Sequence, residues 1–241
     1  MCSVEKRGKL FILTLTGNHQ HWLNPSLINS ILKALSLVKA EAGASPGSVL
    51  ITTSQGKFFS NGLDLPWILS ASSLSAARNR LNHMIQIFKP LLAQLLCFPI
   101  PTVAALPGHA AAAGLLLALS HDYLIMRSDR GVLYMSELDL GATLPDYFMA
   151  LAKSKIGSSS VRRDVFLRGM KVRGEAAVRM GIANSAHHGE DGVMEAAVRL
   201  GEELAGRNWD GDAYAEIRKS LYPEISGLLG LTPKVITISK L

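Results

Sequence analysis

The stretch from Pro107 to Tyr123, PGHAAAAGLLLALSHDY, constrains the fold of this chain more than any other. The run before it, 102–106, favours a buried strand, and the apolar run 114–119 is typical of a buried helix. Glycine and alanine between the two let a ligand approach the main chain, where the first amides of a helix lack intrahelical acceptors. Such a junction can bind an anionic oxygen. Tight packing of strand against helix is the alternative explanation for its small residues.

A membrane span is not expected here, although residues 103–119 are almost free of charge. Pro107, Gly108, His109 and Gly114 interrupt the run, so too few apolar residues remain for a span of ~20. The 241 residues are 48% hydrophobic and 18% charged. They predict a soluble globular chain of one medium domain, or one domain with an appendage.

The chain is basic, with 25 Lys and Arg against 19 Asp and Glu. These charges are dispersed, so we expect a solvated basic surface and no nucleic-acid partner, although a phosphorylated small molecule would be attracted. Cys2 and Cys97 stand far apart, and no apolar signal region precedes the first expected strand, which favours a reduced intracellular protein. The seven His form no ligand pattern, so no metal is expected.

Hydrophobic periodicity predicts an α/β fold that gives way to helices after residue 188. Strands are expected at 10–16, 49–53, 102–106, 123–126, 132–134 and 182–186, and the main helices at 25–42, 75–97, 114–119, 147–156, 159–168, 174–180, 193–204 and 212–229. The expected division is therefore an α/β core over residues 1–188, a helical region over 189–230 and a tail over 231–241.

A second stretch of interest, SQGKFFSNGLDL, follows the expected strand at 49–53. Its Asn61-Gly62 dipeptide favours positive φ and exposes the amide of the next residue, Leu63. By itself Asn-Gly indicates only a turn. Its place after a buried strand makes this a candidate ligand-facing loop.

A carboxylate, Glu137, stands among apolar residues in the stretch MSELDLGATLP. Burial would raise its pKa, which suits a group that must both accept and donate a proton. An exposed acid in a turn is the alternative, and Asp139 is the rival candidate two residues further on.

Three stretches, FFSNGLDL, PGHAAAAGLLLALSHDY and YMSELDLG, occur in this order along alternating strands and helices. Together they resemble the crotonase (enoyl-CoA hydratase/isomerase) superfamily, up to about Leu221. Within it the chain looks most like the plant-type peroxisomal Δ3,Δ2-enoyl-CoA isomerases. The resemblance implies a crotonase-like spiral of ββα units, and C-terminal helices (189–230) that assemble homotrimers or dimers of trimers.

The resemblance also implies roles for individual residues. The amides of Leu63 and Ala113 would form an oxyanion hole, with alanine where many relatives have glycine, and Glu137 would be the catalytic carboxylate. No metal or redox cofactor is implied, because coenzyme A arrives as part of the acyl-CoA substrate. The residues implied to contact the substrate are Ser60, Asn61, Gly62, Leu63, Asp64, Gly114 and Ser136.

Hydratases of this superfamily carry a second glutamate where this chain has Leu116. Adding water across a double bond requires a positioned water and proton transfers shared by two carboxylates. Moving a double bond requires only one base and an oxyanion hole. The resemblance therefore implies an isomerase that converts 3-enoyl-CoA to trans-2-enoyl-CoA. A hydratase and a non-catalytic acyl-CoA-binding protein are the alternatives.

The chain ends in Ser239-Lys240-Leu241, a tripeptide that the peroxisomal import receptor reads. Thr232-Pro233 disfavours an ordered helix up to this end, so a flexible tail is expected over 231–241. The signal predicts the peroxisomal matrix, where β-oxidation of unsaturated fatty acids generates 3-enoyl-CoA. The targeting tripeptide and the expected isomerase reaction therefore point to the same compartment.

Overall fold

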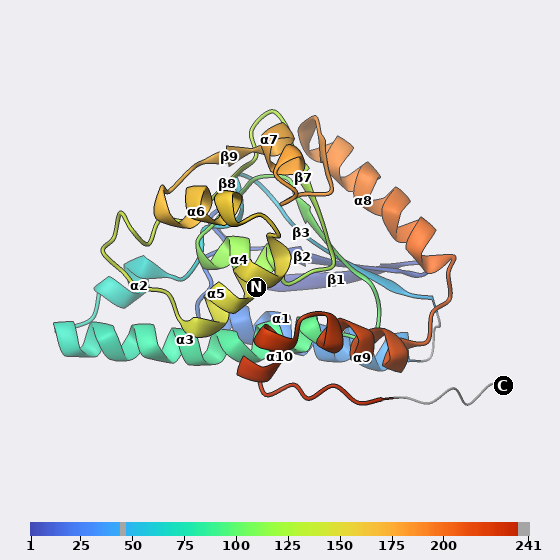
Figure 1. Cartoon of the computed structure of the whole chain (residues 1–241), viewed down its shortest axis with the longest axis horizontal. Coiled ribbons are helices and arrows are strands. Elements are labelled where there is room, and N and C mark those ends of the chain that lie inside the picture. The colour runs from blue at the N-terminus through green and yellow to red at the C-terminus, as the bar shows by residue number, and fades with distance from the viewer. Residues whose placement is uncertain (44–46, 236–241) are drawn as a thin grey trace.

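A computed structural model describes residues 1–43 and 47–235, and within them the chain forms two β-sheets surrounded by helices (Figure 1). The larger sheet has the order β1-β2-β3-β5-β7-β10 and is parallel except for the β1–β2 pair. Its strands are β1 (Cys2–Arg7), β2 (Leu10–Leu15), β3 (Val49–Ser54), β5 (Thr102–Leu106), β7 (Tyr123–Arg127) and β10 (Ser185–His187).

The smaller sheet has the order β4-β6-β8-β9, in which β4, β6 and β8 run parallel. Its strands are β4 (Phe58–Ser60), β6 (His109–Ala111), β8 (Val132–Tyr134) and β9 (Val172–Arg173). The helices are α1 (Pro25–Ala42), α2 (Leu65–Leu69), α3 (Leu74–Leu96), α4 (Ala113–Leu119), α5 (Asp146–Lys155), α6 (Ser159–Leu167), α7 (Gly174–Arg179), α8 (Gly189–Ala205), α9 (Gly211–Leu221) and α10 (Pro223–Leu228).

The larger sheet packs against a hydrophobic layer on each face, because successive side chains of a strand point to opposite faces of the sheet. On β2, Leu10 and Ile12 pack with Val193 and Leu204 of α8. The neighbours Phe11, Leu13 and Leu15 belong to the core that contains α1 and α3. Figure 1 shows α8 on one side of the larger sheet and α1 and α3 on the other. Helix α8 thus packs as a layer of the core, although it follows residue 188.

The chain repeatedly leaves the larger sheet, adds a strand to the smaller one and enters a helix. It does so along β3–β4–α2, β5–β6–α4 and β7–β8–α5. This path confirms the expected α/β spiral of ββα units. It also places the ends of β4, β6 and β8, which lead into helices or loops, at one edge of the smaller sheet.

Several short elements differ from the sequence-based expectation. Strands β1, β4, β6 and β9 and helix α2 were not predicted, because runs of only two to six residues carry little periodicity. The strand expected at 182–186 is β10, which begins at Ser185. The single helix expected at 212–229 is α9 and α10, since Pro223 lacks the amide that would continue α9 and Tyr222 leaves helical geometry.

A buried ion pair fixes α9 to the core. The guanidinium of Arg218, which is 3% exposed, donates to Asp122 through Nε at 2.7 Å and through Nη2 at 2.6 Å. It also donates to the main-chain oxygens of Phe98 and Ile100. Because all three nitrogens of the planar guanidinium donate to acceptors, these bonds fix the orientation of α9 on the core.

The expected tail is described only as far as Val235, so Ser239-Lys240-Leu241 lie outside the described residues. Among the described helices, none is both long and apolar enough to cross a membrane.

Candidate active site

Three loops that the sequence singled out meet because their strands are parallel neighbours. The Gly62 loop, residues 61–64, follows β4, residues 112–113 follow β6, and residues 135–137 follow β8. The carboxyl ends of parallel strands lie at one edge of a sheet, which is where α/β folds place their ligands.

The amide of Leu63 points away from the loop that carries it. Gly62 adopts φ +83°, and its carbonyl oxygen accepts a hydrogen bond from the amide of Leu23 at 2.8 Å. A trans peptide directs its N–H opposite to its C=O, so this bond aims the Leu63 N–H in the other direction. That N–H has no acceptor among the described residues.

The amide of Ala113 is the first of helix α4. The carbonyl of Ala112 accepts from Leu115 at 3.0 Å and from Leu116 at 3.3 Å, so the Ala113 N–H of the same peptide points out of the helix. It too has no acceptor within the described chain. Both expected oxyanion-hole amides therefore lack an acceptor among the described residues.

Ala112 takes a backbone conformation that the sequence did not predict. Its φ of 50° and ψ of −125° lie in a region that L-residues rarely occupy, at a cost of roughly 1–3 kcal/mol. The amide of Ala112 donates to the carbonyl of Tyr134 at 2.9 Å, which ties the turn to β8. The sequence of four alanines does not indicate a turn with positive φ. Their small side chains are the only feature of the run that is compatible with one.

The two amide-bearing loops pack backbone against backbone. A Cβ atom on Gly62 would lie 3.1 Å from the Ala112 Cβ and 3.4 Å from the Ala113 nitrogen. A Cβ on Gly114 would overlap the carbonyl oxygen of Ser60 and lie 2.8 Å from its carbonyl carbon. Glycine at positions 62 and 114 therefore brings the amides of Leu63 and Ala113 close together.

Glu137 is half-buried in the loop after β8. Its Oε2 accepts a hydrogen bond from the amide of Ser136 at 2.9 Å. Burial raises the pKa of the Glu137 carboxyl above the ordinary glutamate value, although hydrogen bonds from its own amide and from Ser136 oppose the shift. Glu137 is thus partly shielded from solvent, whereas its rival Asp139 is exposed.

Other residues expected to contact the substrate hold the Gly62 loop. The Ser60 hydroxyl is buried and donates to the carbonyl of His21 at 2.8 Å, and the Asn61 amide donates to Gln20. Asp64 caps α2 by accepting from the amide of Trp67 at 3.0 Å. Substrate contacts by Ser60, Asn61 and Asp64 stay predictions.

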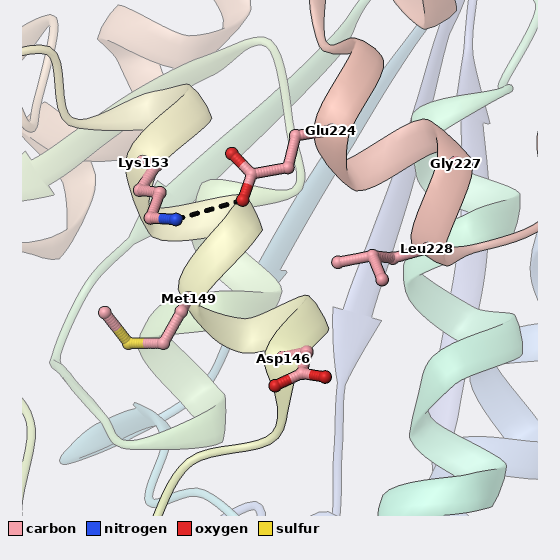
Figure 2. A pocket seen from close by; sticks show the side chains of 6 residues that line it. All are labelled: Asp146, Met149, Lys153, Glu224, Gly227 and Leu228. Atoms are coloured by element: carbon pink, nitrogen blue, oxygen red, sulfur yellow. Dashed lines mark hydrogen bonds and ion pairs between the residues drawn. The ribbon is translucent and has the colours of Figure 1, made fainter.

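Leu116, where the resemblance implies the second glutamate of hydratases, is fully buried in α4. Another acid near the site in sequence, Asp146, begins α5 and lines a groove of about 540 Å³ between α5 and α10 (Figure 2). Figure 2 also shows the ion pair across this groove, between Lys153 and Glu224 at 3.0 Å.

Among the described residues, no group of three or more His, Cys, Asp or Glu side chains is placed to hold a metal ion.

The sequence of the chain is similar to that of a known protein family and of several named proteins. The sequence profile of the family "Enoyl-CoA hydratase/isomerase" matches residues 8–226. The chain is 57% identical to "Enoyl-CoA delta isomerase 2, peroxisomal" of Arabidopsis thaliana, over 100% of both chains. It is 48% identical to "Enoyl-CoA delta isomerase 1, peroxisomal" of the same plant, over 93% of this chain and 91% of the relative.

Solved structures share the fold at low identity. An enoyl-CoA hydratase from Mycobacterium marinum superposes with a TM-score of 0.81 at 20% identity, over 95% of this chain and 94% of that one. An apo enoyl-CoA isomerase from Mtb gives a TM-score of 0.82 at 21% identity, with the same coverage. These structures show the fold, and the match to the family profile with the full-length similarity shows that the chain belongs to the enoyl-CoA hydratase/isomerase family, the crotonase superfamily.

Proposed function

We propose that this protein is a Δ3,Δ2-enoyl-CoA isomerase, which shifts the double bond of a 3-enoyl-CoA to give trans-2-enoyl-CoA in the β-oxidation of unsaturated fatty acids. The observation that carries the proposal is a half-buried carboxylate, Glu137, at the edge of the smaller sheet where the amides of Leu63 and Ala113 have no acceptor among the described residues. The full-length similarity to proteins named enoyl-CoA delta isomerases supports it.

The reaction begins with removal of a proton from C2 of the bound 3-enoyl thioester by the Glu137 carboxylate. The electron pair of the C2–H bond moves into a dienolate, whose oxygen carries the negative charge. The amides of Leu63 and Ala113 donate to that oxygen, and such preorganised donors stabilise the charge as it develops.

Return of the proton completes the isomerisation. The protonated Glu137 donates to C4, the C2–C3 double bond forms, and the thioester carbonyl is restored with no net gain or loss of atoms. A raised pKa of the Glu137 carboxyl favours both accepting and donating the proton, because the protonated form is then less costly to produce near neutral pH. Proton transfer alone moves the bond, so we expect no metal or redox cofactor.

Hydration is the nearest alternative activity. Leu116 presents a buried alkyl group where the superfamily's hydratases carry their second glutamate, and Asp139 is exposed to solvent. Since a positioned acid or base contributes typically 10²–10⁴-fold, we expect isomerisation of 3-hexenoyl-CoA to exceed hydration of 2-hexenoyl-CoA by about 10²-fold or more.

Side-by-side spectrophotometry of the two substrates measures this ratio. Comparable rates would indicate that Asp139 or Asp146 completes a pair of acids and would favour the hydratase. Binding of both thioesters without turnover would instead favour a non-catalytic acyl-CoA-binding protein.

The proposed location is the peroxisomal matrix, reached through the import receptor. The C-terminal Ser239-Lys240-Leu241 and the peroxisomal relatives support this. A fluorescent protein fused in front of the chain, with this C-terminus free, is expected to enter peroxisomes. The same fusion without the three residues is expected to stay in the cytosol, and unchanged import after truncation would contradict the assignment.

A homo-oligomer, as a trimer or a dimer of trimers, is proposed through the C-terminal helices. On α9, Ile217 and Leu221 are 68% and 64% exposed and lie one turn apart, and Trp209 stands beside them. Ile217 and Leu221 line two adjoining hollows of about 500 and 490 Å³. An exposed apolar strip of this kind is typical of a subunit interface.

A further inference from the structure

The segment from Asn18 to Asn24, between β2 and α1, is hydrogen-bonded along β4 and the Gly62 loop. Main-chain bonds run from Asn61 N to Gln20 O at 2.9 Å, from Leu23 N to Gly62 O at 2.8 Å and from Asp64 N to Leu23 O at 3.2 Å. Side-chain bonds from Asn61 to Gln20 and from Asn24 to Asp64 reinforce them. The loop that carries the Leu63 amide is therefore shaped by a segment about 40 residues earlier in the sequence.

His21 makes two of these connections from one residue. Its Nδ1 lies 2.9 Å from the carbonyl oxygen of Phe58, and its own carbonyl accepts from the Ser60 hydroxyl at 2.8 Å. Because a carbonyl only accepts, Nδ1 carries the proton. The side chain is 3% exposed and the backbone has φ +44°, a conformation that turns both groups toward β4. A non-glycine residue keeps such a conformation only where its surroundings impose it.

The connection continues to the peptide that bears the free amide. The Ser60 hydroxyl oxygen accepts from the Gly62 N–H at 3.3 Å, while Leu23 holds the Gly62 carbonyl. Glycine allows many backbone conformations, so these bonds select the one that directs Leu63 N–H outward. Orientation of this donor matters because a misplacement of 1 Å at a reacting group costs about 10²-fold in rate.

We propose that His21 is a positioning residue for the isomerisation, acting through Phe58, Ser60 and Gly62 to hold the Leu63 amide where it receives the thioester oxygen. The inference rests on the proposed function, because the amide that His21 would position belongs to the oxyanion hole of that reaction. His21 itself touches neither the substrate nor the reacting atoms in this account.

Two substitutions at this position separate the hydrogen bond from the fold. His21→Leu removes one of the two side-chain donors to the Phe58 carbonyl and leaves the other, the Ser54 hydroxyl at 3.0 Å. It is expected to lower kcat for 3-hexenoyl-CoA by about 10- to 100-fold, within the loss typical of a displaced or missing oxyanion donor. His21→Asn places an amide N–H near the position of Nδ1 and tolerates positive φ, so it is expected to keep kcat within about threefold of wild type. The affinity for hexanoyl-CoA, a saturated analogue, should change by less than about threefold in both, since the oxyanion hole acts mainly on the transition state.

A matched control uses the other buried histidine bonded to a main-chain carbonyl. His121 is 2% exposed and lies 3.0 Å from the Leu117 oxygen and 2.8 Å from the Thr52 hydroxyl, with no hydrogen bond from its ring to β4 or the Gly62 loop. His121→Leu should lower the melting temperature at least as much as His21→Leu and leave kcat near that of wild type. Equal loss of kcat in the two leucine variants would overturn the inference, because it would trace the loss to general destabilisation.

Ser60→Ala provides a second route should His21→Leu not fold. It removes the bridge from the His21 carbonyl to the Gly62 amide and is expected to lower kcat by about tenfold, as one displaced donor would. Wild-type kcat in folded His21→Leu or Ser60→Ala overturns the positioning role alone. Absence of isomerase activity from the wild-type protein overturns the proposed function, and the inference with it.

Discussion

Replacing Glu137 with glutamine is expected to lower the turnover of 3-hexenoyl-CoA by about 10⁴-fold or more. Loss of a general base typically costs 10²–10⁴-fold, and here one group serves both proton transfers, so the loss falls at or beyond the upper end. Glutamine keeps the shape of the side chain and most of its hydrogen bonding but cannot accept the C2 proton. Steady-state kinetics on the purified variant measures the effect.

Substrate binding should survive this change, because the amides of Leu63 and Ala113 are untouched. The affinity for a substrate analogue is expected to change by less than about tenfold, or about 1.4 kcal/mol. Asp139→Asn is the matched control, since Asp139 is an exposed acid of the same loop, and it should retain near-normal turnover. A Glu137→Gln enzyme with more than about a tenth of wild-type turnover would exclude Glu137 as the base and favour Asp139.

Gly114→Ala is expected to damage both activity and stability, although alanine is usually the better residue in a helix. The new methyl group would overlap the carbonyl oxygen of Ser60, so β4 or α4 must move and the two amides must separate. Overpacking of this kind costs about 1–3 kcal/mol of unfolding free energy, and displacement of the oxyanion donors about 10²-fold in kcat.

Gly227→Ala is the control for helix propensity. A Cβ at Gly227 in α10 would meet no described atom within 4 Å, so alanine should be neutral or stabilise by up to about 1 kcal/mol. Denaturant unfolding and kinetics on both variants compare the two glycines. If Gly114→Ala behaved like Gly227→Ala, the close approach of the Gly62 loop to α4 would not matter to the site.

The loops that carry the candidate site were predictable from the sequence, whereas the short strands β4 and β6 that lead into two of them were not. Leu63 follows an Asn-Gly dipeptide after a strand, Ala113 begins an apolar helix after small residues, and Glu137 stands among apolar neighbours. Each signal is local, because turn chemistry and hydrophobic periodicity act over a few residues. Parallel pairing of β4, β6 and β8 then brings the three positions to one edge.

Features that depend on distant contacts were not predictable. The positive φ of Ala112 is imposed by its bond to Tyr134 and by the start of α4, and neither is visible in an alanine run. The role of His21 requires knowing that residues 18–24 lie beside β4. Arg218, which reads as a solvated charge on a helix, is buried because Asp122 faces it from the core. In each case tertiary contacts override local preference.

A crystal structure of the Glu137→Gln enzyme with 3-hexenoyl-CoA would show whether residue 137 and the two amides meet one substrate, because the variant should hold the substrate without converting it. We expect a thioester oxygen about 2.7–3.1 Å from the amide nitrogens of both Leu63 and Ala113, with the residue 137 side chain reaching C2 and C4 on one face of the acyl chain. A thioester oxygen bonded elsewhere, or a C2 atom out of reach of residue 137, would contradict this expectation.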